Sequence, residues 1–113
     1  MWTAVLRREN GSAMPFEMTV GLWVSDQEKY AQYRAEMGPL LEAAEGGFRY
    51  DFEVSKTLKS EAGGEINRVF VLRFPDRAGK ERFFSDPRYL EIRGRLFDGS
   101  VGRRVTIAEY ASD

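Results

Sequence analysis

Nine residues, 16–24, constrain the fold most, because their side chains alternate with period two. One face of this run is apolar and the other is mixed: Phe16, Met18, Val20, Leu22 and Val24 against Glu17, Thr19, Gly21 and Trp23. Such alternation, with β-branched and aromatic residues, indicates a β-strand with one buried face. Further strands and covering helices must then come from the rest of the chain.

Three more segments have the strand pattern. Residues 48–57 and 66–74 also alternate, and they flank a polar turn that contains Gly63 and Gly64. Two such strands around a glycine-rich turn predict a β-hairpin. Residues 103–110 are predicted to form the last strand.

The segments between these strands have helical spacing. Apolar residues from Tyr30 to Ala44 predict a helix over roughly 26–45. It is capped by Ser25 or Asp26 and ended by Gly46-Gly47. Pro39 lies inside it, where we expect a kink or a break. Asp76 is the predicted cap of a second helix, and Asp86-Pro87 opens a further short helical segment that reaches Phe97.

The predicted order is therefore βαββαβ, which is an α+β fold. Two helices can cover only one face of a four-stranded antiparallel sheet. We expect residues 16–113 to form one domain, and residues 1–15 to be an N-terminal appendage or an extra strand.

Alternation also predicts which side chains each face of the sheet carries. The face toward the helices is expected to carry Phe16, Met18, Val20, Leu22, Phe48, Tyr50, Phe52, Phe70, Leu72, Phe74, Val105 and Ile107. The open face is expected to carry Thr19, Gly21, Trp23, Arg49, Asp51, Glu53, Val69, Val71, Arg73, Thr106, Ala108 and Tyr110. That second face fits a solvated surface, a nucleic-acid platform or a face covered by a second sheet. Its large apolar members favour the second sheet.

The C-terminal third of the chain carries a family resemblance. Its residues are Phe74-Pro75-Asp76, then Phe83 to Tyr89 with the sequence FFSDPRY, then Arg93 to Arg95 and the closing strand. The chain resembles the dimeric α/β barrel superfamily of ferredoxin-like domains, nearest to a small bacterial family of unknown function, over roughly residues 16–110. The resemblance implies a homodimer whose sheets enclose a pocket, and it implies no reaction.

Composition excludes several chemistries. The chain has 113 residues with no Cys and no His, so thiolate or imidazole metal sites and Ser-His or Cys-His pairs are excluded. We expect no metal and no cofactor. The net charge of -1 argues against nucleic acid as a partner. No apolar run approaches the roughly 20 residues of a membrane span, and we expect a cytoplasmic protein without a membrane partner.

Seven residues are candidates for the lining of a cleft between the paired sheets: Trp23, Arg49, Asp51, Glu53, Asn67, Arg73 and Tyr110. Asp51 and Glu53 are two apart on a strand, which suits acid–base work or a hard cation. More simply, they pair with Arg49, Arg73 or Arg104 across the sheet.

The basic and aromatic candidates also have two interpretations each. Arg49 and Arg73 suit a carboxylate or phosphate on a ligand, or they balance the two acids. Trp23, beside the small Gly21, offers a flat surface to a ligand or packs in a dimer interface.

Three functions fit these residues. The first is a homodimer that binds or transforms a small aromatic or carboxylate molecule. If it is an enzyme, the resemblance implies a cofactor-independent monooxygenase-like or isomerase-like activity. The second is a dimeric scaffold or regulatory protein without catalysis. The third, an RNA-binding module, ranks lowest because Phe70 and Phe74 are assigned to the helix side, which leaves no stacking platform.

Overall fold

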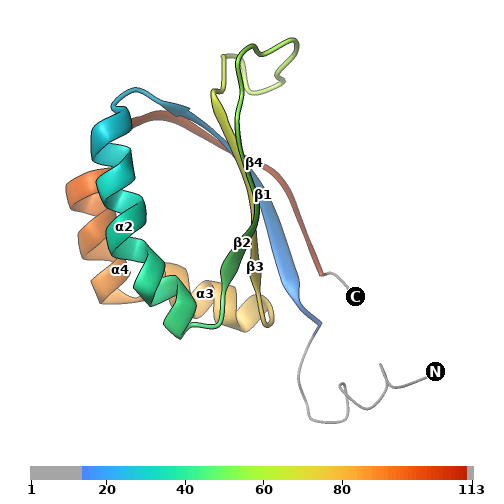
Figure 1. Ribbon diagram of the computed structural model, residues 1–113. Helices are drawn as coiled ribbons and strands as arrows, with labels where there is room; N and C mark the ends of the chain where they lie inside the picture. The colour runs from blue at the N-terminus through green and yellow to red at the C-terminus, as the bar shows by residue number, and fades with distance from the viewer. Residues whose placement is uncertain (1–13, 112–113) are drawn as a thin grey trace.

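Four strands form one sheet, and all helices lie on one side of it (Figure 1). The computed structural model describes residues 14–111. The elements are β1 (Phe16–Val24), α2 (Gln27–Ala43), β2 (Gly47–Glu53), β3 (Arg68–Phe74), α3 (Arg77–Ser85), α4 (Pro87–Ile92), the short π-helix η1 (Arg93–Phe97) and β4 (Val101–Ala111). This order confirms the predicted βαββαβ fold, with the second helical region divided into α3, α4 and η1. Most of residues 1–15, for which we expected an appendage or an extra strand, lie outside the described residues.

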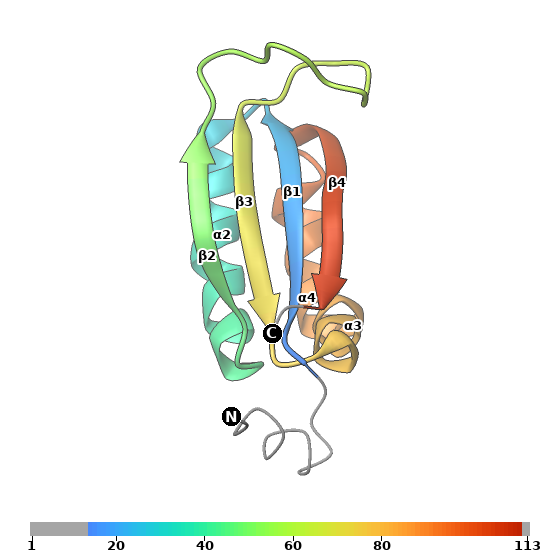
Figure 2. The same cartoon turned by 90° about the vertical axis from the view of Figure 1, so that its right-hand side faces the viewer.

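The strands lie in the order β2-β3-β1-β4, and each neighbouring pair is antiparallel (Figure 2). β1 is therefore an inner strand, which explains why its apolar face is almost fully buried. Within residues 14–111, no helix is long and apolar enough to cross a membrane.

Carboxylate caps set the beginning of each α-helix. Asp26 accepts a hydrogen bond from the backbone N–H of Lys29, Asp76 from that of Gly79 and Asp86 from that of Arg88. Each bond satisfies one of the free N–H groups of a first turn. Of the two caps predicted for α2, Asp26 is the one used.

The path through α2 differs from our expectation in two places. The helix runs without a break from Gln27 to Ala43, Pro39 included. It ends through Glu45, which has a left-handed φ of 62°, and not through a glycine. Gly46 has a different function, because a Cβ there would lie 2.7 Å from the side chain of Leu41.

The core fills the space between the sheet and the helices. Its buried members are Phe16, Met18, Val20, Leu22, Val24, Tyr30, Tyr33, Met37, Leu41, Phe70, Leu72, Phe74, Phe83, Tyr89, Ile92, Leu96 and Phe97. Phe48 packs against this cluster. The inner strands β1 and β3 thus present the predicted side chains to the helices.

The predicted faces of β2 are wrong beyond Phe48. A register shift lies between Phe48 and Tyr50, where Phe48 is opposite Leu72 but Tyr50 is opposite Val71. The extra residue of such a β-bulge changes which face the following side chains occupy. Tyr50 and Phe52 are therefore on the open face, where they are 52% and 54% exposed. Asp51 and Glu53 lie on the helix side, opposite Phe70 and Arg68.

The predicted faces of part of β4 are also wrong, because this strand contains another bulge. Thr19 is opposite Ala108 but Val20 is opposite Thr106, so Ile107 is the additional residue. Val105 is opposite Gly21 on the open face, whereas Thr106 lies on the helix side. Ile107 is also on the open face, since its side chain would lie 3.4 Å from a Cβ at Gly21.

Candidate functional site

The open face, meaning the side of the sheet away from the helices, contains four of the seven predicted site residues. Arg49, Arg73 and Tyr110 gather at one end of it, around Glu17. Trp23 is six residues further along β1, about 20 Å away at the rise of a strand. The other three predicted residues, Asp51, Glu53 and Asn67, are not part of this group.

Glu17 is the centre of a buried polar cluster that sequence reasoning missed. Its carboxylate accepts hydrogen bonds from Arg49 Nη1 at 2.6 Å and from Tyr110 Oη at 2.7 Å. Arg73 Nε lies 3.9 Å away. We call these four residues the Glu17 cluster. Glu17 is only 3% exposed, although it lies on the side of the sheet that no helix of residues 14–111 covers.

Register explains why the cluster forms. Glu17 is directly opposite Arg73 on β3 and Tyr110 on β4. Arg49 reaches the same place from the bulge of β2. Side chains directly opposite on neighbouring strands are close enough to pair. The sequence signal was a lone acidic residue on an inner strand between two positions that carry apolar side chains.

Charge pairing controls the protonation of Glu17. Loss of hydration acts to raise the pKa of its carboxyl, but hydrogen bonds from Arg49 and Tyr110 and the nearby guanidinium charges outweigh it. The net result is a pKa below the ordinary value of 4.5. The hydrogen bond that the Tyr110 hydroxyl donates to the Glu17 carboxylate raises the pKa of Tyr110, because the charged acceptor favours the protonated phenol.

Glu17 is therefore expected to make the fold acid-sensitive. A carboxyl with a lowered pKa in the folded state stabilises the fold above its unfolded-state pKa, and this contribution disappears as the pH falls through the lowered value. Denaturant unfolding at fixed protein concentration should show Glu17→Gln less stable than the original chain at pH 7. The difference in the free energy of unfolding between the two proteins should narrow steadily below pH 4.5. Glu61→Gln, in the exposed loop after β2, is the control. If the free energies of unfolding of Glu17→Gln and the original chain changed in parallel with pH, Glu17 would not be the source of the acid sensitivity.

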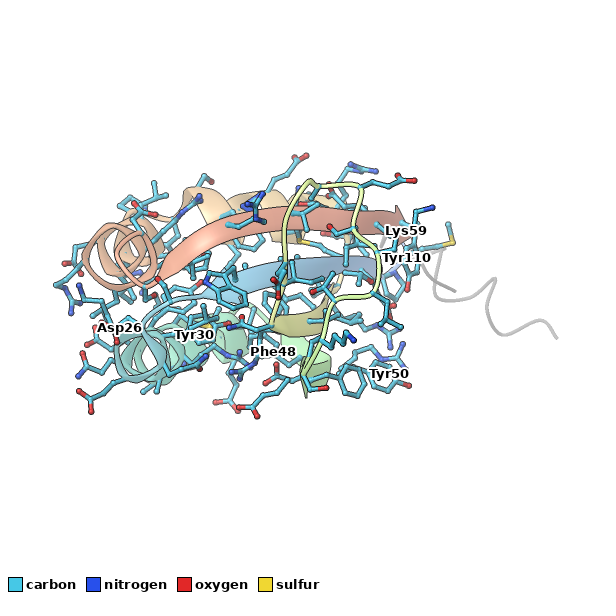
Figure 3. All side chains as sticks on the ribbon, turned by 90° about the horizontal axis from the view of Figure 1, so that it is seen from above. Asp26, Tyr30, Phe48, Tyr50, Lys59 and Tyr110 are labelled. Atoms are coloured by element: carbon cyan, nitrogen blue, oxygen red, sulfur yellow. The ribbon has the colours of Figure 1, made fainter. Side chains whose placement is uncertain are left out.

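The rest of the open face is mostly apolar. Around Gly21, a Cβ would meet Ile66 at 3.0 Å, Val105 at 3.3 Å and Ile107 at 3.4 Å. Tyr50 and Phe52 stack with ring centroids 6.0 Å apart. Figure 3 shows Tyr50 and Tyr110 on the side away from the helices, whereas Tyr30 and Phe48 lie between the sheet and the helices.

Asp51 belongs to a separate ion-pair group at the β2 edge, on the helix side. It accepts hydrogen bonds from Arg34 of α2 and from Arg68, whose Nε lies 3.0 Å away. The Arg34 guanidinium stacks 3.8 Å from the ring centroid of Phe48. Burial acts to raise the pKa of Asp51, but the two arginines hold it below its usual range. The predicted pairing of Asp51 with arginine is thus correct in kind, but its partners differ from the predicted ones.

Asn67 and Trp23 lie at the opposite end of the sheet. The Asn67 amide accepts from the backbone N–H of Val24 at 2.7 Å and donates to its carbonyl at 3.0 Å. This pair clamps the end of β1, so the amide has a structural role. Trp23 lies beside Gly102 and Arg103. Among residues 14–111, no three acidic side chains gather as a metal site would need.

The comparisons with known proteins agree with this fold. Residues 19–110 match the model of a domain of unknown function, DUF1330. A protein of unknown function from Rhodopseudomonas palustris superposes with a TM-score of 0.75 at 18% identity, over 100% of this chain and 95% of that chain.

Two further structures extend the comparison. One is a DABB family protein with a ferredoxin-like fold from Mesorhizobium loti (TM-score 0.62, 15% identity, 88% of this chain and 98% of that chain). The other is a dimeric ferredoxin-like protein of unknown function from Thermobifida fusca (0.58, 14%, 88% and 92%). No curated protein matches the chain.

The chain therefore has the ferredoxin-like fold of these structures. It belongs to the DUF1330 family, whose model covers most of its length.

Proposed function

We propose that the chain acts as a homodimer that pairs through its open face. One observation supports this most: apolar side chains remain exposed on a sheet face that no element of residues 14–111 covers. The large ones are Trp23, Tyr50, Phe52, Ile107 and Tyr110. Contiguous apolar surface of this kind marks an interaction site in a soluble domain.

A second copy is the occupant that suits this face best. A two-fold pair uses the same surface on both partners, and two sheets pack face to face about 10 Å apart. The face also ends in a polar cluster, which fits the pattern of apolar centre and polar rim in interfaces. The Thermobifida fusca protein is described as dimeric, which supports a pair of copies in this chain as well.

We propose further that the cleft between the paired sheets binds a small aromatic carboxylate at the Glu17 cluster. The cluster holds two guanidinium groups and one carboxylate, so its positive charge exceeds its negative charge. Arg49 also lies 5.7 Å from the ring centroid of Tyr50, which places an aromatic surface beside the cation. An anionic group with a planar body suits both features.

Benzoate is the probe that tests this ligand site. Saturable binding in calorimetry should be weakened at least about tenfold by Arg49→Gln, which removes one charged partner of the ligand. Arg88→Gln is the matched control, because Arg88 is exposed on the helix layer and pairs only with Asp86 among the described residues. Absence of saturable benzoate binding would instead support a dimeric scaffold without a ligand.

A further inference from the structure

A second polar site lies inside a single chain, on the opposite side of the sheet from the open face. A cavity of about 40 Å³ lies within the core between the sheet and the helices. Most of its wall is apolar, with contributions from Met18, Val20 and Phe70. Five of its lining residues carry polar groups: Tyr30, Tyr33, Tyr89, Arg93 and Arg104. The Tyr30 hydroxyl already accepts a hydrogen bond from Arg34.

Tyr33 and Tyr89 leave one hydrogen-bond donor between them unused. Their hydroxyl oxygens lie 2.8 Å apart, and both side chains are buried. Two hydroxyl groups have two protons, and the bond between them uses one. Among residues 14–111, no other acceptor bonds to either hydroxyl. Burial raises the pKa of both tyrosines, so both protons are present at neutral pH. A buried donor without an acceptor is costly, and the cavity beside it is where an acceptor atom can enter.

The charges beside this pair are positive. Arg93 is 3.7 Å from Asp98, which is a loose ion pair at the surface. Arg104 has no ion pair or hydrogen bond with any residue between 14 and 111, and its exposed side chain lies at the rim of the cavity. Both guanidinium groups lie close enough to Tyr89 to favour its ionised form. The cavity thus has a free O–H donor of the Tyr33–Tyr89 pair near two guanidinium groups, while most of its remaining wall is apolar.

We propose that this cavity is a binding site for a carboxylate of two or three carbons, whose oxygens contact Tyr89, Arg93 and Arg104. An anionic acceptor satisfies the free hydroxyl proton and the unpaired guanidinium together. The volume limits the ligand to a few atoms, because about 40 Å³ is little more than the space of one water molecule. Even two carbons require that Met18 and Met37, which line the cavity and have flexible side chains, move aside. An aromatic ring is too large.

Acetate is the probe, and acetamide is its uncharged isostere. We expect acetate to shift the NMR signals of the Tyr33 and Tyr89 rings saturably, with a Kd on the order of millimolar for so few atoms. Acetamide should bind at least tenfold more weakly than acetate. Sodium chloride at matched ionic strength controls for screening.

Two neighbouring arginines of β4 provide the matched variants. Arg104→Gln should weaken acetate binding at least tenfold, and Tyr89→Phe should weaken it in the same direction. Arg103→Gln should leave it unchanged, because Arg103 is on the open face and donates to the carbonyl of Ala62. Circular dichroism confirms that each variant is folded.

Three outcomes would overturn the proposal: no saturable effect of acetate, equal binding of acetamide, or equal losses in Arg103→Gln and Arg104→Gln. The test is independent of dimerisation, because the cavity is built from one chain. Acetate binding by a chain that stays monomeric at every concentration would reject the paired dimer and keep this site. Benzoate binding that depends on Arg49, without acetate binding, would do the reverse.

Discussion

Ile107→Glu should convert the proposed dimer into a monomer. Ile107 is 52% exposed on the open face, beside Gly21 and Val105, so the single chain tolerates a charge there. In the pair, the substitution removes the burial of an apolar side chain from each copy and places a carboxylate without a partner between two sheets. Each copy carries the change, so the dissociation constant should rise at least about a hundredfold, or roughly 3 kcal/mol.

Leu90→Glu is the matched control for this prediction. Leu90 is 46% exposed, but it lies on α4 in the helix layer (Figure 1). The two variants have the same new charge and almost the same exposure, on opposite sides of the molecule. Sedimentation velocity should show the dimer for Leu90→Glu and the monomer for Ile107→Glu. Equal behaviour of the two variants would contradict pairing through the open face.

Phe74→Ala should lower the free energy of unfolding by about 3–5 kcal/mol, the range for a phenylalanine in a well-packed core. Phe74 is 1% exposed and its ring contacts Phe83 and Phe84. The cavity left behind cannot collapse easily, because Gly46 already brings the backbone against this ring. Such a loss is a large part of the total stability of a small domain.

Phe52→Ala separates assembly from folding. Phe52 is 54% exposed on the open face, so its removal should change the stability of a single chain by less than about 1 kcal/mol. The same change should weaken the dimer. Urea unfolding at several protein concentrations measures both effects, because only a change in dimerisation depends on concentration. For Phe52→Ala, a loss in the free energy of unfolding as large as that of Phe74→Ala and independent of protein concentration would contradict the placement of Phe52 on the open face and of Phe74 in the core.

The inner strands and the N-terminal helix caps were predictable from the sequence, but the edge strands and the end of α2 were not. Alternation in residues 16–24 and 68–74 continues without interruption, so each side chain faces the predicted way. In β2, a bulge at Arg49 reverses the faces of the residues that follow. In β4, a bulge at Ile107 leaves the residues after it on the predicted face but reverses Val105 and Thr106, and a further register shift lies between Trp23 and Val24 of β1. Neither Arg49 nor Ile107 is a residue type that indicates a bulge. A change of register by one residue reverses every position on one side of it.

The same bulges explain the errors in the candidate site. They move Asp51 and Glu53 away from the open face and bring Tyr50 and Phe52 onto it. The argument against RNA binding rested on Phe70 and Phe74 of β3, which face the helices as predicted and are buried, and on the net charge of -1. The exposed Tyr50 and Phe52 lie on the edge strand β2, which that argument did not consider. A short oligonucleotide that competes with dimerisation would reject the prediction that the chain does not bind nucleic acid. Glu17 was missed because pairing with Arg49 depends on the bulge and pairing with Tyr110 on the register of β4.

Sedimentation equilibrium on the unmodified chain tests the central claim most directly. Pairing through the open face predicts a species of twice the chain mass of 13.0 kDa, with dissociation only on dilution. A single species of 13.0 kDa at every concentration, up to the highest that stays in solution, would contradict the paired sheet and the cleft proposed beside the Glu17 cluster.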